Sequence, residues 1–265
     1  MPLAAAALMF TSCEELENVC GIDDDDFAIG ESYVEATGGF IDIVNRVDVA
    51  LRDSTLQTTG MNNIDGANCT LTSDSLFIDF GSTNVNTSNG NRRGRIKAGI
   101  SGDYFTAGSS VGIMTEDFYY NDVQLAGDVS ITNTTGSAYE LACINMGVGT
   151  EIDFTTTLTL SWTAGFATMY DLDDDSYTLS GMSSGTSTMS NNAFNATINP
   201  ALSYDRTCQY GVTEGVASLT LTGDSISTAN LGVDFLSNDA CNNLFKITAD
   251  CDGNNISVTR SFDGF

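Results

Sequence analysis

Alternation of apolar and polar residues with a period of two is the feature that most constrains this chain. Its clearest instance is residues 154–162, where Phe154, Leu158 and Trp162 fall on one side and threonines and a serine fall on the other. Successive side chains of a strand point to opposite faces, so this segment has one buried and one solvated face. That pattern is typical of antiparallel sheets.

Shorter alternating segments recur from residue 69 onward and are separated by turn residues such as Asn121 and Asp122. We count about nine to twelve strands at short spacing, which favours a sandwich or a barrel. The sequence therefore predicts an all-β fold, an antiparallel β-sandwich or barrel-like sheet pair with one N-terminal helix. Residues 55–265 would form its single all-β domain.

One helix is predicted over residues 32–54. Ser32 and Glu35 have the spacing of a capping box, which marks a helix start. Gly38 and Gly39 weaken the first half of the helix, because glycine disfavours helix interiors. The apolar residues at helical spacing are Phe40, Ile43, Val44, Val47, Ala50 and Leu51.

The N-terminus has the order of a secretory signal. An apolar run over residues 4–10 meets Thr11 and Ser12 and then Cys13. This resembles a bacterial lipobox, and the acidic cluster behind it resembles the surface-export signal of Bacteroidota lipoproteins. We expect residues 1–12 to be a signal peptide with a truncated start, Cys13 to be lipidated, and 13–31 to be an acidic tether. The alternative is a frayed N-terminus with a chance cysteine.

The chain has seven cysteines. Giving Cys13 to the lipid leaves an even set, which an exported protein can join into disulfides. Buried free thiols are the alternative. The spacings contain no C-x-x-C, which argues against a zinc or redox site. The disulfide candidates are Cys20, Cys69, Cys143, Cys208, Cys241 and Cys251.

Charge and composition exclude several functions. The chain has 35 acidic against 9 basic residues, a formal net charge of −26. Such a field repels phosphate backbones, which argues against nucleic acid as a partner, and it suits cations or basic partners. The chain has no histidine. That removes Ser-His-Asp and Cys-His nucleophile systems and His-ligated zinc.

Two charged motifs are candidate sites. Asp171, Asp173 and Asp175 alternate, as ligands of a structural calcium ion do in a loop, and no other cofactor is indicated. A solvated acidic loop is the alternative. The basic cluster at residues 92–95 could contact an acidic loop of this chain or of a partner, or simply balance charge beside a hairpin.

Several stretches together resemble a family of Bacteroidota surface lipoproteins of unknown function. The resemblance implies a surface location and an all-β body, and it brings no activity with it. Ser54, Ser75 and Ser225 also lie in triplets that resemble the O-glycosylation signal of that phylum. The stretches are residues 69–71, 76–81, 93–96, 118–123 and 127–133, Trp162, residues 177–185 and Cys208.

Location and the absence of a catalytic motif lead to one functional hypothesis. We expect a non-catalytic, lipid-anchored cell-surface protein that serves as a binding or structural component of an outer-membrane assembly. Its partner would be an outer-membrane or surface protein, and the lipid would be its only membrane contact. The alternatives are a secreted, carboxylate-dependent hydrolase acting on glycans, and a subunit of a surface fibre.

Overall fold

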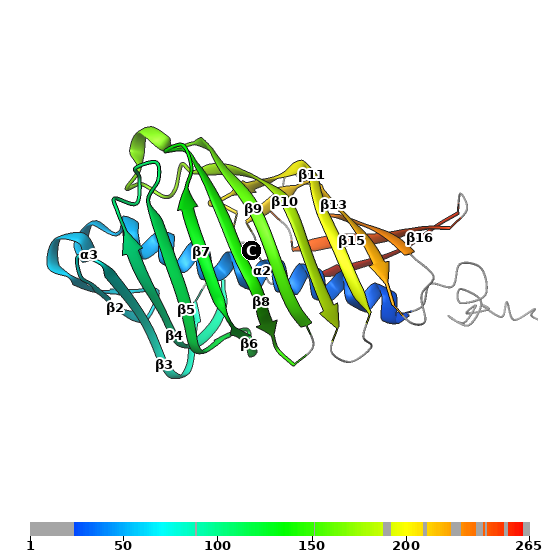
Figure 1. Ribbon diagram of the computed structural model, residues 1–265, viewed down its shortest axis with the longest axis horizontal. Helices are drawn as coiled ribbons and strands as arrows, with labels where there is room; N and C mark the ends of the chain where they lie inside the picture. Colours follow the sequence, from blue (N-terminus) through cyan, green and yellow to red (C-terminus); the bar gives the residue numbers. More distant parts are fainter. Residues whose placement is uncertain are drawn as a thin grey trace, which may run out of the picture.

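A computed structural model describes residues 24–87, 89–150, 152–187, 192–208, 211–223, 229–236, 241, 243–251 and 254–261. In this part of the chain, two α-helices precede a single antiparallel sheet (Figure 1). The helices are α2 (Asp24–Arg52) and α3 (Ser54–Thr59), and η2 (Phe166–Thr168) is a 3₁₀ turn. The strands are β1 (Met61–Ile64), β2 (Ala67–Leu71), β3 (Ser75–Thr87), β4 (Gly90–Ser101), β5 (Ser110–Tyr120), β6 (Val123–Ala126), β7 (Asp128–Asn133), β8 (Ala138–Val148), β9 (Ile152–Ala164), β10 (Ser176–Ser187), β11 (Ala193–Asp205), β12 (Val212–Glu214), β13 (Val216–Thr222), β14 (Ala229–Asp234), β15 (Leu244–Cys251) and β16 (Asn254–Ser261).

The sheet has 16 strands in one hydrogen-bonded array. Its main order is β1-β2-β3-β4-β5-β6-β8-β9-β10-β11-β13-β14-β15-β16, while β7 pairs with β5 and β8 and β12 pairs with β11. The all-β class, the antiparallel pairing and the N-terminal helix are thus confirmed. The architecture differs in one respect, because a single continuous sheet stands where a pair of sheets was expected.

Helix α2 supplies the packing that a second sheet gives in a sandwich. In Figure 1 it runs along one face of the sheet and crosses most of the strands. All residues from 36 to 44 are buried, so this part of the helix is packed around most of its circumference. Phe40 of α2 packs edge-to-face against Phe154 of β9, with ring centroids 6.4 Å apart. Helix and sheet therefore share one hydrophobic core.

The helix begins earlier than the sequence predicted. It starts at Asp24 instead of Ser32, so the second part of the expected tether is helical. Three aspartates in the first turn favour this start, because negative charge stabilises a helix N-terminus. Two glycines of α2 make close packing possible, and one of them, Gly39, was expected to weaken the helix. A Cβ on Gly39 would lie 2.8 Å from Leu125 Cδ2, and one on Gly30 would lie 2.9 Å from Ile247 Cδ1.

The strand and hairpin expected from the alternation are present. Residues 154–162 lie in β9, and Phe154, Leu158 and Trp162 are buried as predicted. Asn121 and Asp122 form the two-residue turn between β5 and β6, both with positive φ (48° and 67°). Asparagine and aspartate tolerate that conformation better than most residues, which explains their place in the turn.

Candidate functional site

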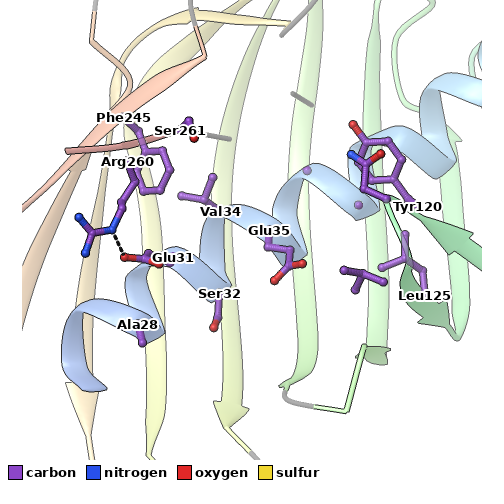
Figure 2. Close-up of a pocket in the computed structure, with 14 residues that line it drawn as sticks. Ala28, Glu31, Ser32, Val34, Glu35, Tyr120, Leu125, Phe245, Arg260 and Ser261 are labelled. Carbon is purple, nitrogen blue, oxygen red and sulfur yellow. Dashed lines mark hydrogen bonds and ion pairs between the residues drawn. The ribbon is translucent and has the colours of Figure 1, made fainter. Parts of the chain in front are cut away.

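A groove of about 400 Å³ lies along the first half of α2, and Figure 2 shows the side chains that line it. Its floor includes Ser32, Val34 and Gly39 of α2. Phe245 of β15 lines it from one direction and Leu125 of β6 from another. Sites for small molecules and single side chains commonly have volumes of about 300–1,000 Å³, so the groove is large enough to hold a ligand.

Charged side chains border this apolar floor. Arg260 Nε of β16 lies 2.6 Å from Glu31 Oε1 of α2, and both side chains are partly exposed. Glu35 lies one helical turn further on, is exposed, and lines both the groove and an adjoining hollow of about 380 Å³. Asp122 lines that second hollow. Of the lining carboxylates, Glu31 is thus paired with Arg260, and Asp122 is paired with Arg93 from outside the lining.

The groove adjoins one end of the strand order. β16 follows β15 and is the last strand of the hydrogen-bonded path, and its Arg260 and Ser261 line the groove. A strand in that position can accept a further extended segment through its backbone groups. The groove thus combines an apolar floor, acidic groups and a terminal strand, which together suit an extended basic segment.

At the far end of α2, a buried ionic cluster joins the helix to the sheet. Arg52 Nη1 lies 2.5 Å from Asp175 Oδ2 and 3.4 Å from Asp48 Oδ2. Trp162 Nε1 donates to Asp175 Oδ1 over 2.9 Å, and Tyr177 Oη donates to its Oδ2 over 2.9 Å. Burial opposes the charge of Arg52, but Asp48, Asp175 and Tyr177 outweigh it, so the pKa of Arg52 is raised.

The ion pair with Arg52 draws one end of the acidic loop, at Asp175, into the core. Asp171 and Asp173 are exposed and adjacent, with Asp173 N donating to Asp171 Oδ1 over 3.1 Å. Asp175 is fully buried and binds Arg52, so it does not share a surface with the other two. Among the residues that the structure describes, no group of three or more His, Cys, Asp or Glu side chains is placed to hold a metal ion.

The basic cluster at residues 92–95 pairs within the protein. Arg92 is fully buried and its guanidinium lies 2.6 Å from Asp42 of α2. Arg93 Nη1 lies 2.5 Å from Asp122 Oδ1. Hydrogen bonds from Asn84 and Arg93 lower the pKa of Asp122. Of the alternatives raised by the sequence, contact with acidic groups of the same chain is the one observed.

The cysteines divide into two groups. Cys208 and Cys241 form a disulfide. Cys69 and Cys143 were each named as disulfide candidates, but both thiols are free. Each lies on a strand with its side chain in the core, which is the alternative raised by the sequence. Burial raises the pKa of Cys69 to about 11 and that of Cys143 to about 12. Cys13 and Cys20 lie outside the described residues, as does the side chain of Cys251.

The predicted glycosylation serines lie at different places. Ser54 is exposed and begins α3. Ser75 begins β3, is partly buried, and donates to Asp74 Oδ1 over 3.1 Å. Ser225 lies outside the described residues. Of the two described serines, Ser54 is therefore the more accessible to a modifying enzyme.

Sequence reasoning missed the groove residues and the partners of Asp175. Glu31 and Glu35 carried one signal, since two acids four residues apart lie on the same side of a helix. Arg52 carried another, as a charge at the end of an apolar helix face. Arg260 had no local signal, because its partner lies 229 residues away in the chain.

Comparisons with protein-family models, curated proteins and solved structures find no match for this chain. In the residues described, none of the helices combines the length and the hydropathy needed to cross a bilayer. The function therefore has to be argued from the groove itself.

Proposed function

We propose that this protein is a non-catalytic, lipid-anchored cell-surface protein that holds an extended basic segment of a partner protein in the α2 groove. The observation that carries the proposal is the groove itself. On a helix whose residues are mostly buried, it leaves Glu35 exposed beside an apolar floor. The same groove reaches the terminal strand β16, beside which an extended segment can lie.

Charge favours a basic partner. Glu31, Glu35 and Asp122 line the groove and its adjoining hollow, but Glu31 pairs with Arg260 and Asp122 with Arg93, so the attraction comes mainly from the chain as a whole. The whole chain adds a net charge of −26, which attracts a cationic segment from a distance. Such attraction mainly speeds association, while the apolar floor slows dissociation once the segment is seated.

The expected lipid anchor agrees with this arrangement. The sequence places Cys13 eleven residues before the start of α2. An extended chain of that length spans roughly 36–40 Å at most. If Cys13 carries the lipid, the start of α2 lies within that distance of the membrane plane, and the groove begins at Ala28, one helical turn further on.

Site-specific crosslinking tests the proposal. A photoreactive amino acid is placed at Ser32 or Glu35 in the full chain, and at exposed Glu140 of β8 as the matched control. After irradiation of intact expressing cells, we expect both groove positions to crosslink the same surface protein. The control position should not. The crosslinked peptide should be rich in Lys or Arg.

Binding of that peptide then gives a quantitative check. Glu35→Lys should weaken binding about tenfold or more, since it replaces attraction by repulsion. Glu140→Lys makes the same charge change away from the groove and should leave binding unchanged. Equal crosslinking from all positions would contradict the proposal. So would hydrolytic turnover of a glycan that is lost on replacing one carboxylate, which would instead identify a hydrolase.

A further inference from the structure

Two aromatic side chains stand exposed at the end of the molecule opposite the groove. Tyr170 is 61% exposed and Phe166 is 43% exposed, and both belong to the turn between β9 and β10. Large exposed rings on a soluble surface commonly mark a binding site when they occur together. Phe166 also contacts buried Trp162, with ring centroids 5.1 Å apart, so the turn is packed onto the core.

The turn is held in place from below by a buried charge. Arg52 Nε donates to the carbonyl of Met169 over 2.6 Å, and its Nη2 donates to the carbonyl of Asp171 over 3.1 Å. These bonds fix the backbone on both sides of Tyr170. A ring that is already fixed loses little conformational entropy when a ligand binds, which improves affinity.

A hollow of about 480 Å³ lies beside Tyr170. Its wall includes Phe105, whose ring packs edge-to-face with that of Tyr170, with ring centroids 5.8 Å apart. Its polar lining includes the exposed side chains of Gln57, Thr72 and Asp103. The hollow therefore has aromatic faces together with several hydrogen-bond acceptors.

We propose that this hollow binds a neutral carbohydrate. One C–H-bearing face of a sugar ring packs against Tyr170, and the edge of the sugar lies against Phe105, whose ring is nearly perpendicular to that of Tyr170. The sugar hydroxyls donate to Gln57 and to Asp103, which already accepts bonds from Phe105 N and Thr106 Oγ1. A carboxylate accepts several hydrogen bonds at once, as a polyhydroxylated ligand requires. The net charge of −26 and the carboxylate of Asp103 disfavour phosphorylated or uronic sugars. This site is separate from the α2 groove and does not depend on the function proposed for it.

Titration of the full chain with neutral oligosaccharides tests the proposal, with oligouronates as the charged comparison. The probes are short gluco-, manno- and galacto-oligomers, and heat of binding is measured. We expect at least one neutral series to bind and the oligouronates not to bind. Tyr170→Ala should weaken binding about tenfold, because it removes an aromatic face.

Two control variants separate this site from the rest of the surface. Met182→Ala removes another side chain that is 67% exposed, on β10, and should leave glycan affinity unchanged. Glu35→Lys in the groove should also leave it unchanged. The proposal is overturned if no neutral series binds at millimolar concentration, if Tyr170→Ala binds as well as the parent, or if an oligouronate is preferred.

Discussion

Arg52 joins the end of α2 to the sheet and to the turn between β9 and β10. It closes α2, pairs with two carboxylates, stacks over Trp162 at 4.7 Å and holds the turn that carries Tyr170. Its side chain is only 1% exposed. A buried charge is tolerated when each of its donors finds a partner, and each such partner becomes costly to remove.

We expect Asp175→Asn to destabilise the protein by about 3–5 kcal/mol, because it leaves the buried Arg52 without its closest counter-charge. Denaturant unfolding of the purified chain measures this change. Arg95→Gln is the control, since it breaks ion pairs to Asp79 and Glu116 that lie at the surface. It should barely move the unfolding midpoint. Equal effects of the two variants would contradict a special role for the buried pair.

The two free thiols, Cys69 and Cys143, are buried single residues whose titration also affects stability. Burial raises the pKa of Cys69 from 9.0 to about 11 and that of Cys143 from 9.0 to about 12. The folded state thus holds these protons more tightly than the unfolded chain. Their contribution to stability is complete below pH 9 and is lost as the pH rises through 11 to 12.

We therefore expect the free energy of unfolding to fall between pH 9 and pH 12, measured by urea titration at each pH. Buried tyrosines such as Tyr33, whose pKa burial also raises, add to the fall. Cys143→Ala removes one thiol and should make the fall shallower. In the native protein at pH 8, both thiols should resist alkylation, and rapid labelling would refute their burial.

At the scale of elements, the β4–β5 pair contains a bulge that depends on glycine. The pairing is interrupted between Arg93 and Arg95, and Gly94 lies between them with φ +88°. A Cβ at Gly94 would lie 1.9 Å from the carbonyl oxygen of Asp117. The bulge allows neighbouring arginines to point to different partners, one into the core and others to the surface.

Gly94→Ala should cost about 1–2 kcal/mol for the left-handed backbone and about 1–3 kcal/mol more for the collision with β5. Gly81→Ala is the matched control, since Gly81 has a similar φ of +78° and open space around its Cβ position. It should show the backbone cost alone. Thermal unfolding of both variants measures the difference, and equal losses would exclude the collision.

Elements were more predictable from the sequence than the contacts between them. Strand β9 and the turn at Asn121 follow from local alternation and backbone preference, which need no knowledge of distant residues. The start of α2 was wrong because its first turns gain their stability from packing, with Gly30 against Ile247 of β15. The sequence grouped Asp175 with Asp171 and Asp173, but Asp175 points into the core. Its direction depends on Arg52, which lies 123 residues earlier in the chain.

At the scale of the whole molecule, one sheet and one helix form one core. The sequence showed strands that each bury one face, but alternation does not reveal what covers that face. A second sheet and a long helix satisfy the same pattern. The burial of most residues of α2 against the sheet is the observation that distinguishes them, and Figure 1 shows the helix lying along one face of the strands.

A single core implies a single unfolding transition. Trp162 is the only tryptophan of the chain, so its fluorescence reports on the ionic cluster, while far-UV circular dichroism reports on the sheet. We expect the two signals to share one midpoint in guanidinium, and Gly94→Ala to lower both by the same amount. Midpoints that separate would indicate two independently folding units.

The contact between α2 and the hairpin of β15 and β16 has a consequence for biogenesis. Glu31 meets Arg260, and Gly30 meets Ile247, so the first helix is completed by the last described strands. During synthesis, α2 is made more than two hundred residues before the strands that cover it at Ile247 and Arg260. Contacts so distant in sequence slow folding and leave apolar surface accessible meanwhile.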